Sequence, residues 1–247
     1  SYLFKTEPGE GRLPLYEGKM IHQFTHTWDD GLRYWIAEKD GRKAILGRGE
    51  HDKGQVLGYQ KYRLGVRAIG RSTDSRTLIV GPIPKRVFCG NSILVVDRTT
   101  IGGRDFLDEE VIFLQGTLNS LVVDYYTRQM VSANLNMFYI YQLPVPRLTE
   151  SDEVFGQIAK RAARLICTTP EFDDLAKEVG LKSHKDGATD QVERARLRAE
   201  LDGLVAHLYG LTEEEFAYIL TTFPLVPDPV KTAARNAYRD VERGLIK

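Results

Sequence analysis

The segment from Tyr62 to Val80, YRLGVRAIGRSTDSRTLIV, decides how the N-terminal half of this chain folds. Apolar residues at positions 62, 64, 66 and 68 alternate with Arg63, Gly65 and Arg67. This period of two is typical of a strand with one buried face. The following GRSTDS supplies turn-forming residues, since Gly, Ser, Thr and Asp bend the backbone or bond to it locally. The segment therefore predicts a β-hairpin, or a corner of an antiparallel sheet, with both arginines on the face opposite the apolar residues.

The first 100 residues contain further short runs of β-forming residues, separated by glycine-rich connections. Runs of this kind, bounded by turn-forming residues, are typical of short strands. The predicted strands are Met20–Phe24, Tyr34–Ala37, Tyr62–Ile69, Thr77–Val80 and Ser92–Val96.

Helical periodicity begins near Asp108. Apolar and aromatic residues then recur at intervals of three and four, which places them on one face of a helix; they are Val111, Leu114, Leu118, Leu121 and Tyr125. We expect this helix to end near Val131, before SANLN. The run YIYQLPVPRL at 139–148 predicts an extended segment, because each proline disfavours helix in the residue before it.

The last hundred residues have an almost entirely helical pattern. Thr169-Pro170 is typical of an N-cap followed by proline at the first helical position, and Thr212 with Glu215 fits a capping box. We therefore predict an α+β fold with a mainly antiparallel β domain at residues 1–147, followed by an α-helical region at residues 148–247.

Composition limits the class of protein. The chain has 247 residues, 34 basic and 34 acidic, and 42% of its residues are hydrophobic. No apolar run approaches the roughly 18 residues of a membrane-spanning helix, and the start has no secretory signal. Cys89 and Cys167 lack the spacing of metal ligands, which fits a reducing, cytoplasmic location. Because the sequence opens on Ser1 rather than Met, we expect a fragment of a larger protein.

The neutral total hides a local excess of positive charge. Between positions 53 and 86 the net charge is +7, with Asp74 as the one acid; the basic residues are Lys53, Lys61, Arg63, Arg67, Arg71, Arg76, Lys85 and Arg86. Compensating acid clusters lie at 105–110, 149–153 and 212–216. A concentrated positive field of this kind is what binding to a polyanion requires, although a run of charges is often only a solvated surface.

Arginine dominates this basic segment, and its guanidinium group bonds in bidentate fashion to phosphates and to guanine in the major groove. The predicted DNA contacts are Arg63, Arg67, Arg71 and Arg76, with Ser72 and Thr73 as donors to phosphate oxygens and Lys19, Lys61, Lys85 and Arg86 as weaker candidates. Arg63 and Arg67 share a strand face and are expected to behave alike.

No catalytic residue is predicted. The sequence has no G-x-S-x-G nucleophile elbow, no Walker loop, no Asn-Pro-Pro-aromatic tetrapeptide and no spaced nuclease carboxylates. His22 and His26 lie about 13 Å apart if their segment is a strand, so we expect two polar histidines and no metal site. Several aromatic residues could stack on bases, but their spacing is more typical of a core; they are Tyr125, Tyr126, Phe138, Tyr139 and Tyr141.

Four blocks of the sequence stand out, at 13–24, 62–92, 118–148 and 201–226. They read LPLYEGKMIHQF, YRLGVRAIGRSTDSRTLIVGPIPKRVFCGNS, LNSLVVDYYTRQMVSANLNMFYIYQLPVPRL and LDGLVAHLYGLTEEEFAYILTTFPLV. In this order they resemble the target recognition domain and helical tail of type IIG restriction–modification enzymes and related N6-adenine DNA methyltransferases. The resemblance implies binding of double-stranded DNA with sequence preference. It also implies an upstream methyltransferase domain of the same parent chain, which holds S-adenosylmethionine, so that no cofactor is expected in this chain.

Two other functions stay open on the sequence. The chain could be a protein-interaction module that docks on an acidic partner through its basic face, or an enzyme with a nuclease site that no motif reveals. Salt-dependent binding to duplex DNA would favour the recognition domain over the interaction module.

Overall fold

The computed structural model of this protein describes residues 3–29, 31–96, 98, 104–131 and 133–246. The fold is α+β, as predicted. Within the described ranges the strands are β1 (Arg12–Tyr16), β2 (Tyr34–Ala37), β3 (Arg63–Arg67), β4 (Val80–Ile83), β5 (Phe88–Cys89) and β6 (Ile93–Val95). The α-helices are α1 (Glu38–Leu46), α2 (Asp108–Leu118), α3 (Leu121–Met130), α4 (Met137–Ile140), α5 (Glu153–Ile166), α6 (Asp173–Glu178), α7 (Gln191–Leu208), α8 (Glu213–Thr221) and α9 (Asp228–Glu242).

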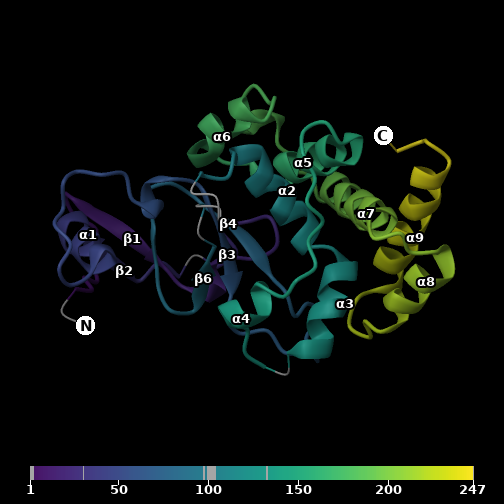
Figure 1. Ribbon diagram of the computed structural model, residues 1–247, viewed down its shortest axis with the longest axis horizontal. Helices are drawn as coiled ribbons and strands as arrows, with labels where there is room; N and C mark the ends of the chain where they lie inside the picture. Colours follow the sequence, from purple (N-terminus) through teal and green to yellow (C-terminus); the bar gives the residue numbers. More distant parts are fainter. Residues whose placement is uncertain (1–2, 30, 97, 99–103, 132, 247) are drawn as a thin grey trace.

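The strands form two small sheets with the orders β2-β1-β5 and β4-β3-β6. All pairings are antiparallel except that of β1 with β5. In Figure 1 the first sheet lies with α1 at one end of the molecule, the second sheet lies near the centre, and α7, α8 and α9 lie at the other end. In the central sheet Arg63 is opposite Ile83 of β4, and Arg67 is opposite Ile93 of β6.

The predicted strand 34–37 is confirmed, and β3 and β6 lie within the predicted ranges. The strand predicted at Met20–Phe24 is wrong, because a 3-10 turn at Gly18–Met20 is followed by a tight turn in which His22 and Thr25 pair. Thr77–Val80 is also largely wrong, since β4 begins only at Val80. The sequence patterns did not predict β1, β5 or α1.

The helix predicted from Asp108 to Val131 is two helices, with a break at Asn119 and Ser120. The Ser120 hydroxyl accepts a hydrogen bond from Val123 N at 3.2 Å and so caps α3. The Asn119 side chain bonds to both backbone groups of Val80, accepting from N at 3.1 Å and donating to O at 2.8 Å. The break therefore places a side chain where β4 needs a hydrogen-bonding partner.

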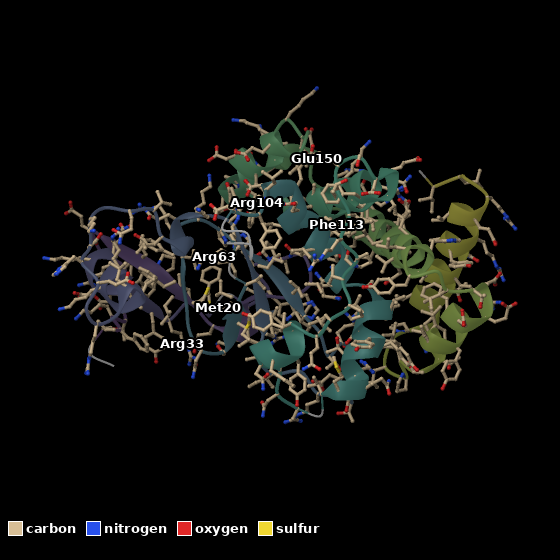
Figure 2. All side chains as sticks on the ribbon, viewed as in Figure 1. Met20, Arg33, Arg63, Arg104, Phe113 and Glu150 are labelled. Atoms are coloured by element: carbon tan, nitrogen blue, oxygen red, sulfur yellow. The ribbon has the colours of Figure 1, made fainter. Side chains whose placement is uncertain are left out.

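The C-terminal helices pack directly on α2. The rings of Phe113 and Phe155 stack with centroids 4.8 Å apart, and Phe113 lies among the helices in Figure 2. A Cβ atom at Gly116 would lie 2.8 Å from Ile158 Cγ2, so glycine allows α2 and α5 this close approach. One apolar cluster thus contains residues from both sides of the predicted domain boundary at 147/148. That the two parts fold as separate units stays a prediction.

Several local predictions for the second half are confirmed. Thr212 caps α8, and Glu215 Oε2 accepts from Thr212 N at 2.8 Å, which completes the capping box. Pro170 opens a 3-10 turn, Pro170–Phe172, that leads into α6. The segment predicted to be extended at 139–148 is helical over its first two residues, because α4 ends at Ile140, and non-helical afterwards.

Candidate nucleic-acid interface

Two adjoining cavities form a groove beside the end of β3. The outer cavity has a volume of about 610 Å³ and the inner one about 220 Å³, and the two share His22, Ser75, Arg76 and Leu225 as walls. The outer cavity is also lined by Lys19 and Arg67, and the inner one by Arg198 of α7. We call these two cavities the basic groove, because cations from four separate segments of the chain line it.

Arg67 occupies the last position of β3, where its backbone N donates to Ile79 O at 3.0 Å. Its side chain is half-buried and, among the described residues, makes no ion pair. Burial lowers the pKa of Arg67, and the nearby Asp74 carboxylate opposes that effect. Arg67 is therefore a partly desolvated cation that faces the groove without a bonded partner.

The turn that follows β3 is held by its own side chains. Arg71 N donates to Asp74 Oδ2 at 3.1 Å, and the Thr77 hydroxyl donates to Arg71 O at 2.9 Å. A Cβ atom at Gly70 would lie 2.0 Å from Thr77 O, so only glycine fits there. The turn keeps the Arg71 and Thr73 side chains exposed and that of Ser72 half-buried.

Arg76 has a different place from the one predicted. Its side chain is mostly buried, with Nε 3.0 Å from Asp124 Oδ2, and it also donates to Asn119 O. Asp124 accepts in addition from Leu78 N at 2.9 Å. Burial raises the pKa of Asp124, and the charge of Arg76 opposes that rise. Arg76 therefore helps to build the floor of the groove and is bonded within the protein.

Arg63 is also placed differently. The sequence predicts that Arg63 and Arg67 behave alike, but their surroundings differ, because Arg63 is only 8% exposed and Arg67 is half-buried. Arg63 donates to Val87 O at 2.5 Å, and burial lowers its pKa. Figure 2 shows Arg63 inside the central part of the molecule. The alternation that predicts an exposed face fails here because the segment of Val87 and Cys89 lies against Arg63, and the first four residues of β3 are all buried.

Each of the four weaker candidates forms an ion pair. Lys19 lies 3.5 Å from Asp29, Lys85 lies 3.2 Å from Asp174, Arg86 lies 2.8 Å from Glu38, and Lys61 pairs with Asp105. Exposed pairs of this kind contribute little stability, typically about 0–1 kcal/mol, so an anionic ligand can compete for the cation. Of these four, Lys19 is the one that lines the basic groove.

The two histidines have separate environments. His22 stacks on Trp28, with ring centroids 4.2 Å apart, and lines both cavities. Burial first, and then the charges of three guanidinium groups, lower the pKa of His22 to about 4, so its ring is neutral at pH 7. His26 is buried and bonds to the Tyr16 hydroxyl and the Thr169 hydroxyl, each at 3.1 Å.

The predicted aromatic residues divide between core and surface. Tyr125 and Tyr139 are half-buried and pack against apolar clusters. Tyr126, Phe138 and Tyr141 are exposed. The predicted core position is thus confirmed for two of the five residues. The other three are not among the residues that line the basic groove.

Arg198 is a groove residue that the sequence did not reveal. It lies in α7 within ERARLRAELD, and the alternating charges of this run are typical of a helix face exposed to solvent. Its side chain is mostly buried, and burial is the first cause that lowers its pKa to about 10. Only the tertiary packing of α7 beside the turn at 70–77 brings this guanidinium into the inner cavity.

In the part of the chain that the structure describes, no three His, Cys, Asp or Glu side chains are grouped so as to hold a metal ion. The described helices include none that is long and apolar enough to cross a membrane. No protein-family model, no curated protein and no solved structure matches this chain. The chemistry that the groove offers is electrostatic recognition of an anion.

Proposed function

We propose that the chain binds double-stranded DNA through the basic groove and the adjoining turn at 70–77, as the target recognition part of a larger adenine-specific DNA methyltransferase or restriction–modification enzyme of the cytoplasm. The observation that carries this proposal is the groove itself. In a protein with no net charge, cations from four segments converge there, and Arg67 makes no ion pair in the described part of the chain.

The proposed contacts follow from exposure. Arg67 and Arg71 are available for phosphate oxygens or base edges, and the hydroxyls of Ser72 and Thr73 are suited to phosphates. Arg63 and Arg76 are left out of the contact set because their guanidinium groups are bonded inside the protein. The ion-paired Lys61, Lys85 and Arg86 would add a more diffuse attraction, which salt screens readily.

S-adenosylmethionine and the extrusion of the target base belong, in this proposal, to the upstream methyltransferase domain of the parent chain. The chain described here then supplies the choice of sequence and no chemical step. Isothermal titration of the isolated chain with S-adenosylmethionine is expected to release no heat of binding, and a micromolar isotherm would show that it has a cofactor site of its own.

The proposal is tested by fluorescence anisotropy with a labelled duplex of about 20 base pairs, which spans more than one helical turn. If two arginines contact phosphates, a log–log plot of affinity against salt has a slope of at least about −2. The double substitution of Arg67 and Arg71 by glutamine is expected to flatten this slope toward zero. Arg48→Gln, a change of the same kind at an exposed position away from the groove, is the control.

The same titration distinguishes DNA binding from the alternative function, a protein-interaction module. A module that docks on an acidic protein would bind polyglutamate and show no measurable affinity for duplex DNA at low salt. Absence of DNA binding by the folded chain would overturn the proposed function.

A further inference from the structure

We propose that Arg198 and Arg67 together hold one phosphodiester group of the DNA backbone where the two cavities of the basic groove meet, so that α7 takes part directly in DNA binding. The inference rests on the proposed function and deepens it, because it assigns a ligand group to the groove and a contact to the C-terminal helices.

Arg198 has no bonded partner among the described residues. Within the described residues its guanidinium makes no hydrogen bond and no ion pair, and Nε is fully buried. Its Cζ atom lies 6.0 Å from the centroid of the Phe24 ring. Burial of a cation without a hydrogen-bonding partner is costly. A ligand that supplies acceptor oxygens would remove that cost.

Positive charge exceeds negative charge around the floor of the groove. Three guanidinium groups, those of Arg76, Arg128 and Arg198, face two carboxylates, those of Asp124 and Asp202. The carboxylates already accept from backbone N–H groups, including a 2.7 Å bond from Leu121 N to Asp202. The guanidinium group of Arg194 also acts on Arg198, but it is bonded to Leu165 O and Ala188 O. The positive charges therefore outnumber the carboxylates even when both acids are ionised, and in the described part of the chain Arg198 is the cation without a bonded partner.

The walls of the groove are chemically suited to a phosphodiester group. His22 and Ser75 line both cavities, and at pH 7 the neutral imidazole adds no charge and can donate one N–H. A phosphodiester carries a single negative charge and two free oxygens, which match the planar fork of an arginine. The inner cavity has a volume of about 220 Å³, which is large enough for such a group and too small for a helix or strand of a partner protein.

The test combines two measurements on Arg198→Gln, Arg198→Lys and Arg67→Gln, with Arg243→Gln as the control. Arg243 is exposed and follows the end of α9, whereas the groove residue Pro227 precedes the start of that helix. The first measurement is duplex affinity against salt. The second is the melting temperature with inorganic phosphate or with chloride at equal ionic strength.

Arg198→Gln is expected to weaken duplex binding about tenfold near 0.1 M salt and to flatten the log–log slope by about one unit. It should also abolish the extra thermal stabilisation by phosphate. Its melting temperature in chloride should equal or exceed that of the unchanged protein, because an unbonded buried cation is removed. Arg198→Lys should keep most of the slope and lose part of the affinity, since lysine retains the charge without the fork.

The outcomes separate this inference from the proposed function. If Arg67→Gln weakens DNA binding and Arg198→Gln behaves as Arg243→Gln does, the phosphate site is wrong and DNA binding stands. If phosphate stabilises the protein through Arg198 but no variant affects DNA binding, a free phosphate is the ligand and the assignment to the DNA backbone is overturned. A lower melting temperature of Arg198→Gln in chloride would mean that Arg198 is structural, which also contradicts the inference.

Discussion

An arginine lies at each end of β3, and the two differ in burial and in bonding. Arg63 at the start is buried and bonded to Val87 O, whereas Arg67 at the end opens into the basic groove without an ion pair among the described residues. The two are four residues apart and share a strand face. A count of basic residues in the sequence therefore overstates the positive charge available to a ligand, because some basic side chains are bonded inside the protein.

The largest expected effect concerns the internally bonded arginines. Asp124→Ala leaves Arg76 and Arg128 without their shared carboxylate and removes the acceptor of Leu78 N. Removal of one partner from a buried ionic network typically costs about 3–5 kcal/mol. We therefore expect urea unfolding, followed by circular dichroism, to show a loss of this size. Asp124→Asn, which keeps an oxygen acceptor, is the control and should lose less; a loss of under about 1 kcal/mol for Asp124→Ala would contradict the network.

A smaller loss of stability is expected at the start of β3. Arg63→Ala removes the stem that fills the interior and leaves Val87 O without its donor. An unsatisfied buried acceptor costs about 1–3 kcal/mol, so the free energy of unfolding should fall by about 2 kcal/mol. The affinity of the folded protein for duplex DNA should stay unchanged. A specific loss of DNA binding with normal stability would mean that Arg63 reaches the ligand after all.

The contrast at β3 also shows what the sequence could predict. Alternation located β3, and turn-forming residues located the turn after it, because both signals are local. Nothing local indicates that the segment of Val87 lies against Arg63, and this contact between residues 24 positions apart accompanies the burial of Arg63. The break at Asn119 escaped the helical pattern for a related reason: its side chain is needed by Val80, 39 positions earlier in the chain.

The site was predicted in part for the same reason. Arg67 and Arg71 lie where a charge-rich hairpin suggests, but Arg198 comes from a helix more than 100 residues away, and its sequence context is that of a solvated face. Lys61, Lys85 and Arg86 lie near the groove in sequence and yet do not line its cavities. Tertiary packing determines which residues line the groove, and a single sequence carries no direct signal of that packing.

At the other end of β3, we expect a substitution of Arg67 to change the affinity for duplex DNA and to leave the stability almost unchanged. Arg67→Ala removes a half-buried cation that no carboxylate of the described residues pairs with, so the free energy of unfolding should change by less than about 0.5 kcal/mol. Duplex affinity near 0.1 M salt should fall about tenfold, the contribution of one phosphate contact. Anisotropy and urea unfolding on the same preparation would check both. Equal losses of stability in Arg63→Ala and Arg67→Ala would break the comparison.

The smallest expected effect tests the field inside the groove. The Asp74 carboxylate lies in the outer cavity with Arg67 and opposes the burial effect on the pKa of that arginine. Its Oδ2 atom also accepts from Arg71 N at 3.1 Å, which an asparagine oxygen can do equally well. Asp74→Asn should therefore keep the turn while it removes a negative charge that lines the outer cavity together with Arg67. Duplex affinity is expected to rise about threefold, in line with the modest strength of a partly solvated charge interaction.

The control for this effect is Glu242→Gln, which changes the net charge equally at an exposed position near the end of α9. If both variants raise the affinity by the same factor, the effect is one of total charge and the local field has no part in it. Asp74→Ala supplies the second comparison, because it removes the acceptor of Arg71 N together with the charge. If the turn holds Arg71 in place for DNA, Asp74→Ala should gain less affinity than Asp74→Asn, since the released turn offsets the gain. An affinity of Asp74→Asn below that of the unchanged protein would place the ligand away from Asp74, and so away from the end of β3 that Arg67 occupies.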